Sequence, residues 1–385
     1  MTATPPLPTV EYRYWACDLR SGNKIAQLPL KPGGALPDRI SDVSTVTFSC
    51  DQYAVLRDGG DFIGTTTPGR TVIVVEREYE GDSTSDILWA GVVTARDAGT
   101  EPDATLNCAT PMAYFGRRHA TTHTYTGAPG HTDTQVIADL LADAATEGIG
   151  LLLDADCPTL RTVTYLASER KPILTCLKDL ADMEGGPEWT VITRWKTEAR
   201  LAVEHVFRAR TRLGWAGEPN IRFDYPGCIT AYKLSDDFTE GHGGNHIVGV
   251  NTNGDAATIS TPARDVQALA QGWPRWEEDI STSSDLNATQ LLGVAKDGLK
   301  KRARGQVTAN IQIDMTSGPQ YGRDWVMGDN ALWFVAAPEP GTDPPSPRHP
   351  QGHSEVIRTI GVAIDVPGAT ITPVLWNPYD EETTS

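Results

Sequence analysis

The chain has 385 residues, of which 33 are basic and 50 are acidic, so its net charge is −17. A chain this acidic is repelled by phosphate backbones, which argues against a nucleic acid as its bound partner. Its length is enough for two or three domains, and its hydrophobic fraction of 39% is ordinary for a globular protein.

The six cysteines lie far apart and form no CxxC pair, so they indicate neither a zinc framework nor a dense disulfide scaffold. We expect buried thiols of a protein made in a reducing cytosol. The first residues do not combine a basic stretch with an apolar core, and no apolar run approaches the ~20 residues that span a bilayer. The sequence therefore predicts neither a secretory signal nor a membrane span.

Residues 1–115 predict a first β-barrel-like domain. Strand-like stretches at 12–19 and 24–28 flank a Ser-Gly-Asn turn and predict a hairpin, and a loop rich in proline and glycine follows at 29–37. Further short strands are expected at 44–50, 71–79, 87–93 and 105–109. Such strands at close intervals, with few helical stretches between them, are typical of a barrel or sandwich.

Residues 116–200 predict a small mixed α/β domain. A helix is expected from about 134 to 146, because its apolar side chains repeat every four residues. Residues 162–193 then predict a strand, a helix and a second strand. Pro172 suits the first turn of that helix, where no N–H donor is needed, and Gly185 ends it.

Residues 201–376 predict a second β-barrel-like domain, with helices near 262–272 and 285–301 and a Pro-rich loop at 336–354. The expected strands are 201–207, 221–225, 228–234, 247–250, 257–260, 307–315, 331–335 and 355–364. An acidic tail at 377–385 is expected to fray. The predicted fold class is therefore mainly β with an α+β insertion: two β-barrel-like domains plus a small mixed α/β domain.

The common catalytic and nucleotide-binding motifs are absent from the sequence, including GxGxxG, the P-loop, GxSxG and HExxH. Three pairs of histidines are spaced four residues apart, a spacing that lets two imidazoles share a metal on a helix. The pairs are His119 and His123, His242 and His246, and His349 and His353. None lies in a convincing helical pattern, so we expect solvated loop histidines.

Carboxylates at Asp236, Asp237 and Glu240 lie beside His242, and paired carboxylates can act as acid and base in glycoside hydrolysis. Adjacent aspartates on a loop or strand point in different directions, which argues against that role here. Alternate glutamates of one predicted strand are expected to form a solvated face: Glu76, Glu78 and Glu80.

Arg117 and Arg118 could bind a phosphate or a carboxylate of a neighbouring subunit, although a surface pair is the simpler interpretation. The tryptophans expected in the core are Trp15, Trp89, Trp189 and Trp333. Trp273 and Trp276 flank Pro274 and precede two glutamates, which makes them harder to bury. Tryptophan is enriched at interface hot spots, so these two side chains could contact a partner. Packing between domains is the alternative role, and the sequence does not decide between the two.

Several stretches in this order carry a resemblance to a known family: the hairpin WACDLRSGNKIAQLP, then ILWAGVV and YFGRR, the helix TQVIADLLADAA, the unit ERKPILTCLKDLADMEGGPEW, the hairpin NHIVGVNTNGDAATI, the helix LLGVAKDGLKKRA, and VTANIQIDM with VMGDNALW. Together they cover most of the chain. The chain resembles the tail hub, or tail-associated minor tail proteins, of long-tailed phages infecting actinobacteria.

The resemblance implies a structural protein of the phage tail tip, not an enzyme. Such hubs are trimers that close the distal tail tube as a pseudo-sixfold ring and join it to the central fibre or spike. The implied partners are the distal tail or tube protein, the tape-measure protein and other minor tail proteins. Genomic DNA would pass through the lumen without specific binding. The implied location is the virion tail tip after assembly in the host cytoplasm, with no catalytic, cofactor-binding or metal-binding residues.

Two alternatives stay open at this point. One is a carbohydrate-binding adhesin of the tail tip, in which exposed tryptophans stack on sugar rings. The other is a cell-wall hydrolase that uses the region of Asp236, Asp237 and Glu240.

Overall fold

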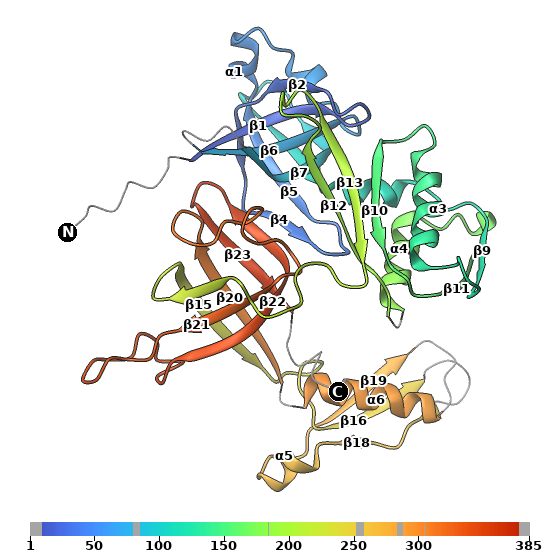
Figure 1. Ribbon diagram of the computed structural model, residues 1–385, viewed down its shortest axis with the longest axis vertical. Coiled ribbons are helices and arrows are strands. Elements are labelled where there is room, and N and C mark those ends of the chain that lie inside the picture. Colours follow the sequence, from blue (N-terminus) through green and yellow to red (C-terminus); the bar gives the residue numbers. More distant parts are fainter. Residues whose placement is uncertain are drawn as a thin grey trace. The chain divides into compact units, whose positions relative to one another are not determined.

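The computed structural model describes residues 10–79, 85–183, 185–251, 258–282, 288–303 and 305–376. The chain divides into two compact units, and Figure 1 labels most of their helices and strands. Among the described residues, the larger unit runs to Thr230 and resumes from Gln312 to Val374, and the smaller unit takes Ala231 to Ile311 with the last two residues. The architecture is mainly β with an α/β insertion, which confirms the predicted fold class.

Seven strands form the first sheet of the larger unit, in the order β2-β1-β6-β7-β8-β5-β3. Their bounds are β1 Val10–Asp18, β2 Lys24–Gln27, β3 Leu30–Pro32, β5 Thr45–Asp51, β6 Thr71–Tyr79, β7 Ser85–Asp97 and β8 Asp103–Ala109. Trp15 of β1 pairs with Gln27 of β2, so the hairpin predicted near the start of the chain is confirmed. Four consecutive residues of β6, from Val72 to Val75, are fully buried. Because successive side chains point to opposite faces, both faces of the sheet are covered there.

Two short helices that the sequence analysis did not predict join β5 to β6: α1 (Gln52–Arg57) and α2 (Phe62–Thr65). Each begins at a capping aspartate, because Ala54 N donates to Asp51 Oδ1 and Gly64 N donates to Asp61 Oδ1, both at 3.0 Å. Helices of six and four residues are too short to show an apolar period, which is why the sequence pattern missed them.

The next region combines helices with two small sheets, β10-β13-β12 and β11-β9. Its elements are η1 Pro111–Arg117, β9 His123–Thr126, α3 Asp133–Ala145, β10 Leu151–Asp156, β11 Thr162–Tyr165, η2 Ala167–Glu169, α4 Ile173–Asp182, β12 Glu188–Trp195 and β13 Val203–Arg210. The helix expected at 134–146 is α3, and the strand-helix-strand unit expected at 162–193 is β11, α4 and β12. Strands β9 and β10 were not expected.

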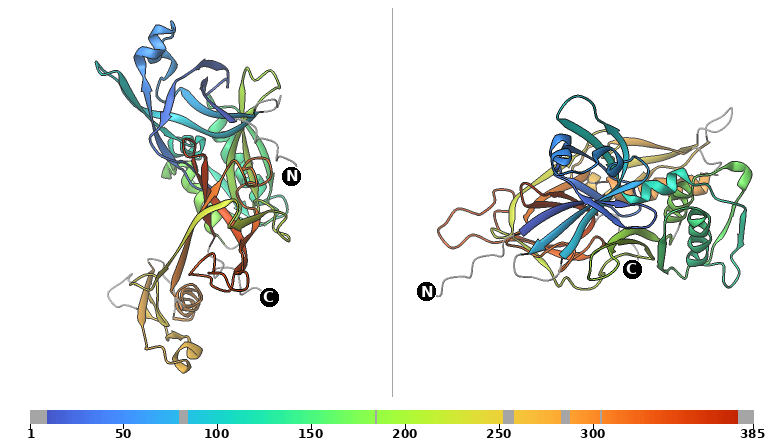
Figure 2. Two further views of the ribbon diagram at one scale, coloured as in Figure 1. Left: turned by 90° about the vertical axis from the view of Figure 1, so that its left-hand side faces the viewer. Right: turned by 90° about the horizontal axis from the view of Figure 1, so that it is seen from above.

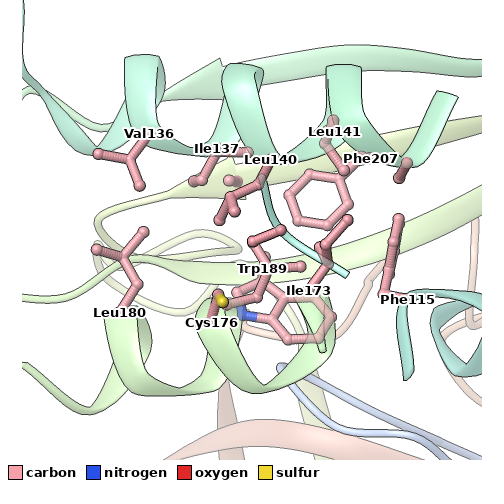
Figure 3. Close-up of a cluster of buried hydrophobic side chains, with 14 of the residues drawn as sticks. Phe115, Val136, Ile137, Leu140, Leu141, Ile173, Cys176, Leu180, Trp189 and Phe207 are labelled. Atoms are coloured by element: carbon pink, nitrogen blue, oxygen red, sulfur yellow. The ribbon is translucent and has the colours of Figure 1, made fainter. Parts of the chain in front are cut away.

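Helices α3 and α4 turn their apolar faces toward each other across the core of this region (Figure 3). The side chains that they bury include Val136, Ile137, Leu140 and Leu141 from α3 and Ile173, Cys176, Leu177 and Leu180 from α4. Trp189 of β12 stacks on Phe207 of β13 in the same cluster, with ring centroids 5.6 Å apart. The helical spacing places the apolar residues of each helix on one face, and the two faces bury each other in a shared core.

The second sheet of the larger unit has the order β14-β21-β22-β23-β20-β15, and β4 pairs with β22. The bounds are β4 Leu36–Arg39, β14 Arg222–Tyr225, β15 Ile229–Asp237, β20 Gln306–Asp314, β21 Asn330–Val335, β22 His353–Asp365 and β23 Thr370–Leu375. Strand β4 corrects the interpretation of 29–37 as a loop, since Leu36 and Pro37 pair with Ile364 and Ala363. Between β21 and β22, residues 336–352 form no helix or strand.

In the smaller unit, β16 (His246–Asn251) pairs antiparallel with β17 (Thr258–Ile259) and β18 (Ala263–Arg264) and parallel with β19 (Glu277–Thr282). Helix α5 (Val266–Ala270) follows β18, and α6 (Ala288–Arg302) packs on the sheet, as the left view of Figure 2 shows nearly end-on. A Cβ built at Gly249 of β16 would lie 2.4 Å from Leu291 O, so glycine permits this close approach. The cap predicted for α6 at Ser284 or Asp285 lies outside the described residues.

None of the described helices is long and apolar enough to cross a membrane.

The six cysteines are all buried and free, which confirms the expectation of buried thiols. Burial raises the pKa of Cys17 and of Cys108 to about 12, and the pKa of Cys157 to about 11. Because the thiolate is the reacting form, we expect almost no labelling of the native protein by Ellman's reagent at pH 8. Unfolding in guanidinium should release six equivalents of thiol per chain. Rapid labelling of the native protein would contradict the burial described here.

Candidate interaction surfaces

In the described part of the chain the three histidine pairs are not arranged as metal sites, and the expectation of solvated loop histidines is wrong for His246, which begins β16 and is 3% exposed. His123 Nε2 lies 2.8 Å from Asp143 Oδ2, and His242 Nδ1 lies 2.8 Å from Asp237 Oδ2. His349 and His353 stack on each other with ring centroids 4.3 Å apart. No group of three histidine, cysteine, aspartate or glutamate side chains is placed to hold a metal among the residues that the structure describes.

The carboxylates considered for hydrolysis are exposed or committed to local hydrogen bonds. Asp237 Oδ1 accepts from Thr239 Oγ1 at 2.7 Å and from Thr239 N at 2.9 Å, and these bonds lower the pKa of Asp237. A general acid needs the opposite shift. Asp236 and Glu240 are exposed. This geometry gives the hydrolase alternative no support.

Arg118 has a structural role that its sequence context did not indicate. Its Nη2 donates to Asp143 O at 2.9 Å and to Thr146 O at 2.8 Å, which satisfies carbonyl groups at the C-terminal end of α3. Arg117 is exposed, as a surface residue would be.

The expected solvated face of glutamates is wrong at Glu76, which is 1% exposed. Its carboxylate accepts from Trp15 Nε1 and from Ser85 Oγ, each at 2.6 Å, and Arg200 Nη1 lies 3.4 Å away. Glu78 contacts Arg13 Nη1 at 2.7 Å, and Glu80 lies outside the described residues. The carboxylate of Glu76 can be buried because these three donor groups replace the hydrogen bonds that it would make with water.

The tryptophans divide as expected between the core and the surface. Trp89, Trp189 and Trp333 are at most 2% exposed, and Trp15 is partly buried. In the smaller unit, Trp273 is 37% exposed and Trp276 is 51% exposed. Trp273 and Trp276 therefore form a candidate interaction surface, at the position that the sequence indicated.

Phe238 joins the two exposed tryptophans into one group, which we call the aromatic platform: Phe238, Trp273 and Trp276. The Phe238 ring centroid lies 5.7 Å from the ring centroids of Trp273 and of Trp276. Val266 and Leu269 of α5, the helix that leads into Trp273, are 72% and 37% exposed. Sequence analysis did not find Phe238, because its contact with the tryptophans depends on long-range packing.

A second exposed apolar group lies on the short helices α1 and α2 of the larger unit. Tyr53, Leu56 and Ile63 are 46%, 55% and 52% exposed. The two helices contact each other and lie between β5 and β6 in the chain. Clustered apolar residues on a surface are a common mark of contact with another protein.

The larger unit also contains a cavity of about 450 Å³, lined in part by the first half of β7, by β12 and by residues from Tyr321 to Met327. Asp38 of β4 reaches this cavity, and burial raises the pKa of Asp38 to about 7, although Arg39 N donates to its Oδ1 at 2.9 Å. Burial, with the charge of Asp38, also raises the pKa of Tyr321. The cavity thus holds a carboxyl group whose burial favours its protonated form.

No protein-family model matches the chain, and no curated protein matches it in sequence. Solved structures do match. The tail protein from Neisseria meningitidis MC58 is 14% identical over 94% of this chain and 95% of that protein, with a TM-score of 0.51. The 43 kDa tail protein of prophage MuSo2 from Shewanella oneidensis is 12% identical over 96% of this chain and 100% of that protein, with a TM-score of 0.55. This chain has the fold of those two tail proteins.

Both similarities extend over nearly the whole chain, so the shared fold is not confined to one of its two units. Identities of 12% and 14% establish the fold without assigning a role to any residue. The interaction surfaces of this chain must therefore be argued from its own side chains.

Proposed function

We propose that this chain is a structural, non-enzymatic protein of a phage tail, namely the hub that closes the distal tail tube. The observation that carries the proposal is the fold shared with two tail proteins over 94% and 96% of the chain. The resemblance of its sequence motifs to tail hubs of phages infecting actinobacteria supports the finer assignment to a hub.

A trimer is the assembly that this proposal requires. Each subunit carries two large sheets, so three subunits place six around one axis, and a ring of this kind matches a sixfold tube to a threefold fibre or spike. Residues 1–115 would supply one barrel-like domain, and the second large sheet, built mainly from 222–237 and 306–375, would supply the other. The mixed region, which includes β13, would project from the ring. Strands β2 and β3 end the first sheet and β14 and β15 end the second, which offers edges for pairing between subunits.

The proposed partners follow from this position in the virion. The distal tail or tube protein would contact one side of the ring, and the central fibre or other minor tail proteins would contact the other. The tape-measure protein would end at the hub. With a net charge of −17, a lumen lined by this chain would repel DNA and let it pass without specific binding.

The mass of the purified protein in solution tests the proposal. We expect sedimentation velocity at micromolar concentration to give three copies of the 41.6 kDa chain, a particle of about 125 kDa. Electron micrographs should show rings with threefold symmetry and six similar lobes. A particle that stays monomeric as the concentration rises to about 100 μM would contradict the hub.

A further inference from the structure

We propose that the aromatic platform of the smaller unit is a binding site for an uncharged glycan. The site lies on Phe238, Trp273 and Trp276, and two of its three rings are more than one-third exposed. The proposal goes beyond the role of a tail hub and does not depend on the oligomeric state of the chain. It rests on the rigidity of the platform, on the charges around it and on its size.

The platform is held rigid before any ligand arrives. Asn245 is fully buried, and its side chain donates to Pro274 O and accepts from Trp276 N, both at 2.8 Å. The backbone N–H of Asn245 also donates to Trp276 O at 3.1 Å. A Cβ built at Gly243 would lie 2.5 Å from Phe238 Cγ, so the glycine lets the phenylalanine ring pack where it does. Such a surface loses little conformational entropy on binding.

The charged groups around the platform are mostly paired with groups of opposite sign. Arg275 pairs with Glu277, and His242 pairs with Asp237. Glu240 is exposed and adds a further acceptor. These groups supply hydrogen-bond donors and acceptors but leave no excess positive charge, so they favour an uncharged ligand over an anionic one.

His246 adds a further backbone hydrogen bond to the loop of Trp276. It begins β16, its backbone N–H donates to Trp276 O at 2.9 Å, and it is 3% exposed. Among the residues that the structure describes, neither ring nitrogen has a hydrogen-bond partner, and Nδ1 lies 3.7 Å from Glu277 Oε1. Both ring nitrogens are buried away from solvent, so His246 helps to hold the loop of the platform through its backbone and supplies no contact to a ligand.

A sugar fits this combination better than a protein surface does. The C–H groups on one face of a pyranose ring form an uncharged, weakly apolar surface that packs on the electron-rich face of an aromatic ring. Its hydroxyl groups meanwhile need the donors and acceptors that surround the platform. The platform with Val266 and Leu269 gives five apolar side chains, whereas a stable protein interface uses about 20–30 residues on each side.

The test uses the full chain and a panel of uncharged tetrasaccharides of glucose, galactose, mannose and N-acetylglucosamine, titrated by calorimetry. We expect at least one of the four to bind saturably, with one site per chain. Trp276→Ala should weaken that binding about tenfold or more, because it removes the most exposed ring of the platform. Trp276→Phe keeps an aromatic face and should stay within about threefold of the wild-type affinity.

Trp215→Ala is the matched control, because Trp215 is a 58% exposed tryptophan of the larger unit and should leave glycan binding unchanged. Circular dichroism of each variant checks that the fold is kept. Failure of all four tetrasaccharides to bind, or equal binding by Trp276→Ala and the wild type, overturns the proposal. A loss of self-association in Trp276→Ala, without any glycan effect, would assign the platform to a protein contact instead. The proposed trimer is tested separately, since Trp276→Ala is expected to keep the wild-type mass.

Discussion

Replacing Arg161 with methionine is expected to lower the free energy of unfolding by about 3 to 5 kcal/mol. Arg161 Nε donates to Asp133 Oδ1 at 2.5 Å, and Nη2 donates to Oδ2 at 2.9 Å. The two side chains are 8% and 0% exposed, so the variant would leave an unpaired carboxylate in the interior. Urea unfolding followed by tryptophan fluorescence measures the loss.

A partly exposed pair in the same region supplies the control. Arg208 Nε lies 2.8 Å from Asp154 Oδ2, and the two side chains are 41% and 36% exposed. Water screens such a pair, so Arg208→Met should cost less than about 1 kcal/mol. Equal losses in the Arg161 and Arg208 variants would show that burial does not set the energy of the Asp133–Arg161 pair.

The loss caused by Arg161→Met should also depend on pH. Burial raises the pKa of Asp133, and Arg161 opposes that shift. Without the arginine, the carboxyl group of the folded variant takes up a proton more readily as the pH falls. The deficit in stability should therefore be smaller at pH 5 than at pH 8, and adding Asp133→Asn should recover part of it.

The parts of the fold that sequence reasoning found are those with a strong local pattern. In α4, Ile173, Leu177 and Leu180 recur at helical spacing, and Pro172 immediately precedes the helix. The alternation in β12 and the turn between β1 and β2 are equally local signals. Such patterns can be recognised from the residues of one element alone, because the period of a helix or strand places its apolar side chains on one face.

The features that sequence reasoning missed depend on partners far away in the chain. Strand β4 exists because Asp38 aligns with Val362, and neither residue carries a local sign of that pairing. Glu76 follows the alternation that predicted a solvated position, yet Trp15 and Arg200 approach it from other parts of the chain. Packing at such long range overrides an element's own pattern.

The candidate site shows the same division. Pro274 and the glutamates that follow it signalled that Trp273 and Trp276 would be hard to bury, and their exposure confirms that prediction. The sequence could not show that Phe238 joins them, nor that Asn245 fixes their loop. Those contacts require β16 and β19 to be aligned, and only the folded sheet sets that register.

Replacing Asp38 with asparagine is expected to stabilise the protein, and to do so more strongly at high pH. Burial raises the pKa of this carboxyl group from 3.8 to about 7. Between those values the folded protein holds a proton that the unfolded chain has released, so the contribution of Asp38 to stability falls as the pH rises through this window. A shift of about three pKa units corresponds to roughly 4 kcal/mol at most, and partial exposure of Asp38 reduces it.

The pH profile distinguishes this effect from a general gain in stability. Asparagine keeps an oxygen acceptor for Arg39 N but carries no charge, so the hydrogen bond at 2.9 Å can persist. In urea unfolding at pH 5, 6, 7 and 8, Asp38→Asn should gain about 2 kcal/mol more over the wild type at pH 8 than at pH 5. Asp97→Asn, which changes an exposed aspartate of β7, should differ from the wild type by less than about 0.5 kcal/mol throughout. Parallel profiles for Asp38→Asn and the wild type would mean that the carboxyl group in the cavity is already ionised at pH 5, and its burial would then carry no energetic cost that depends on pH.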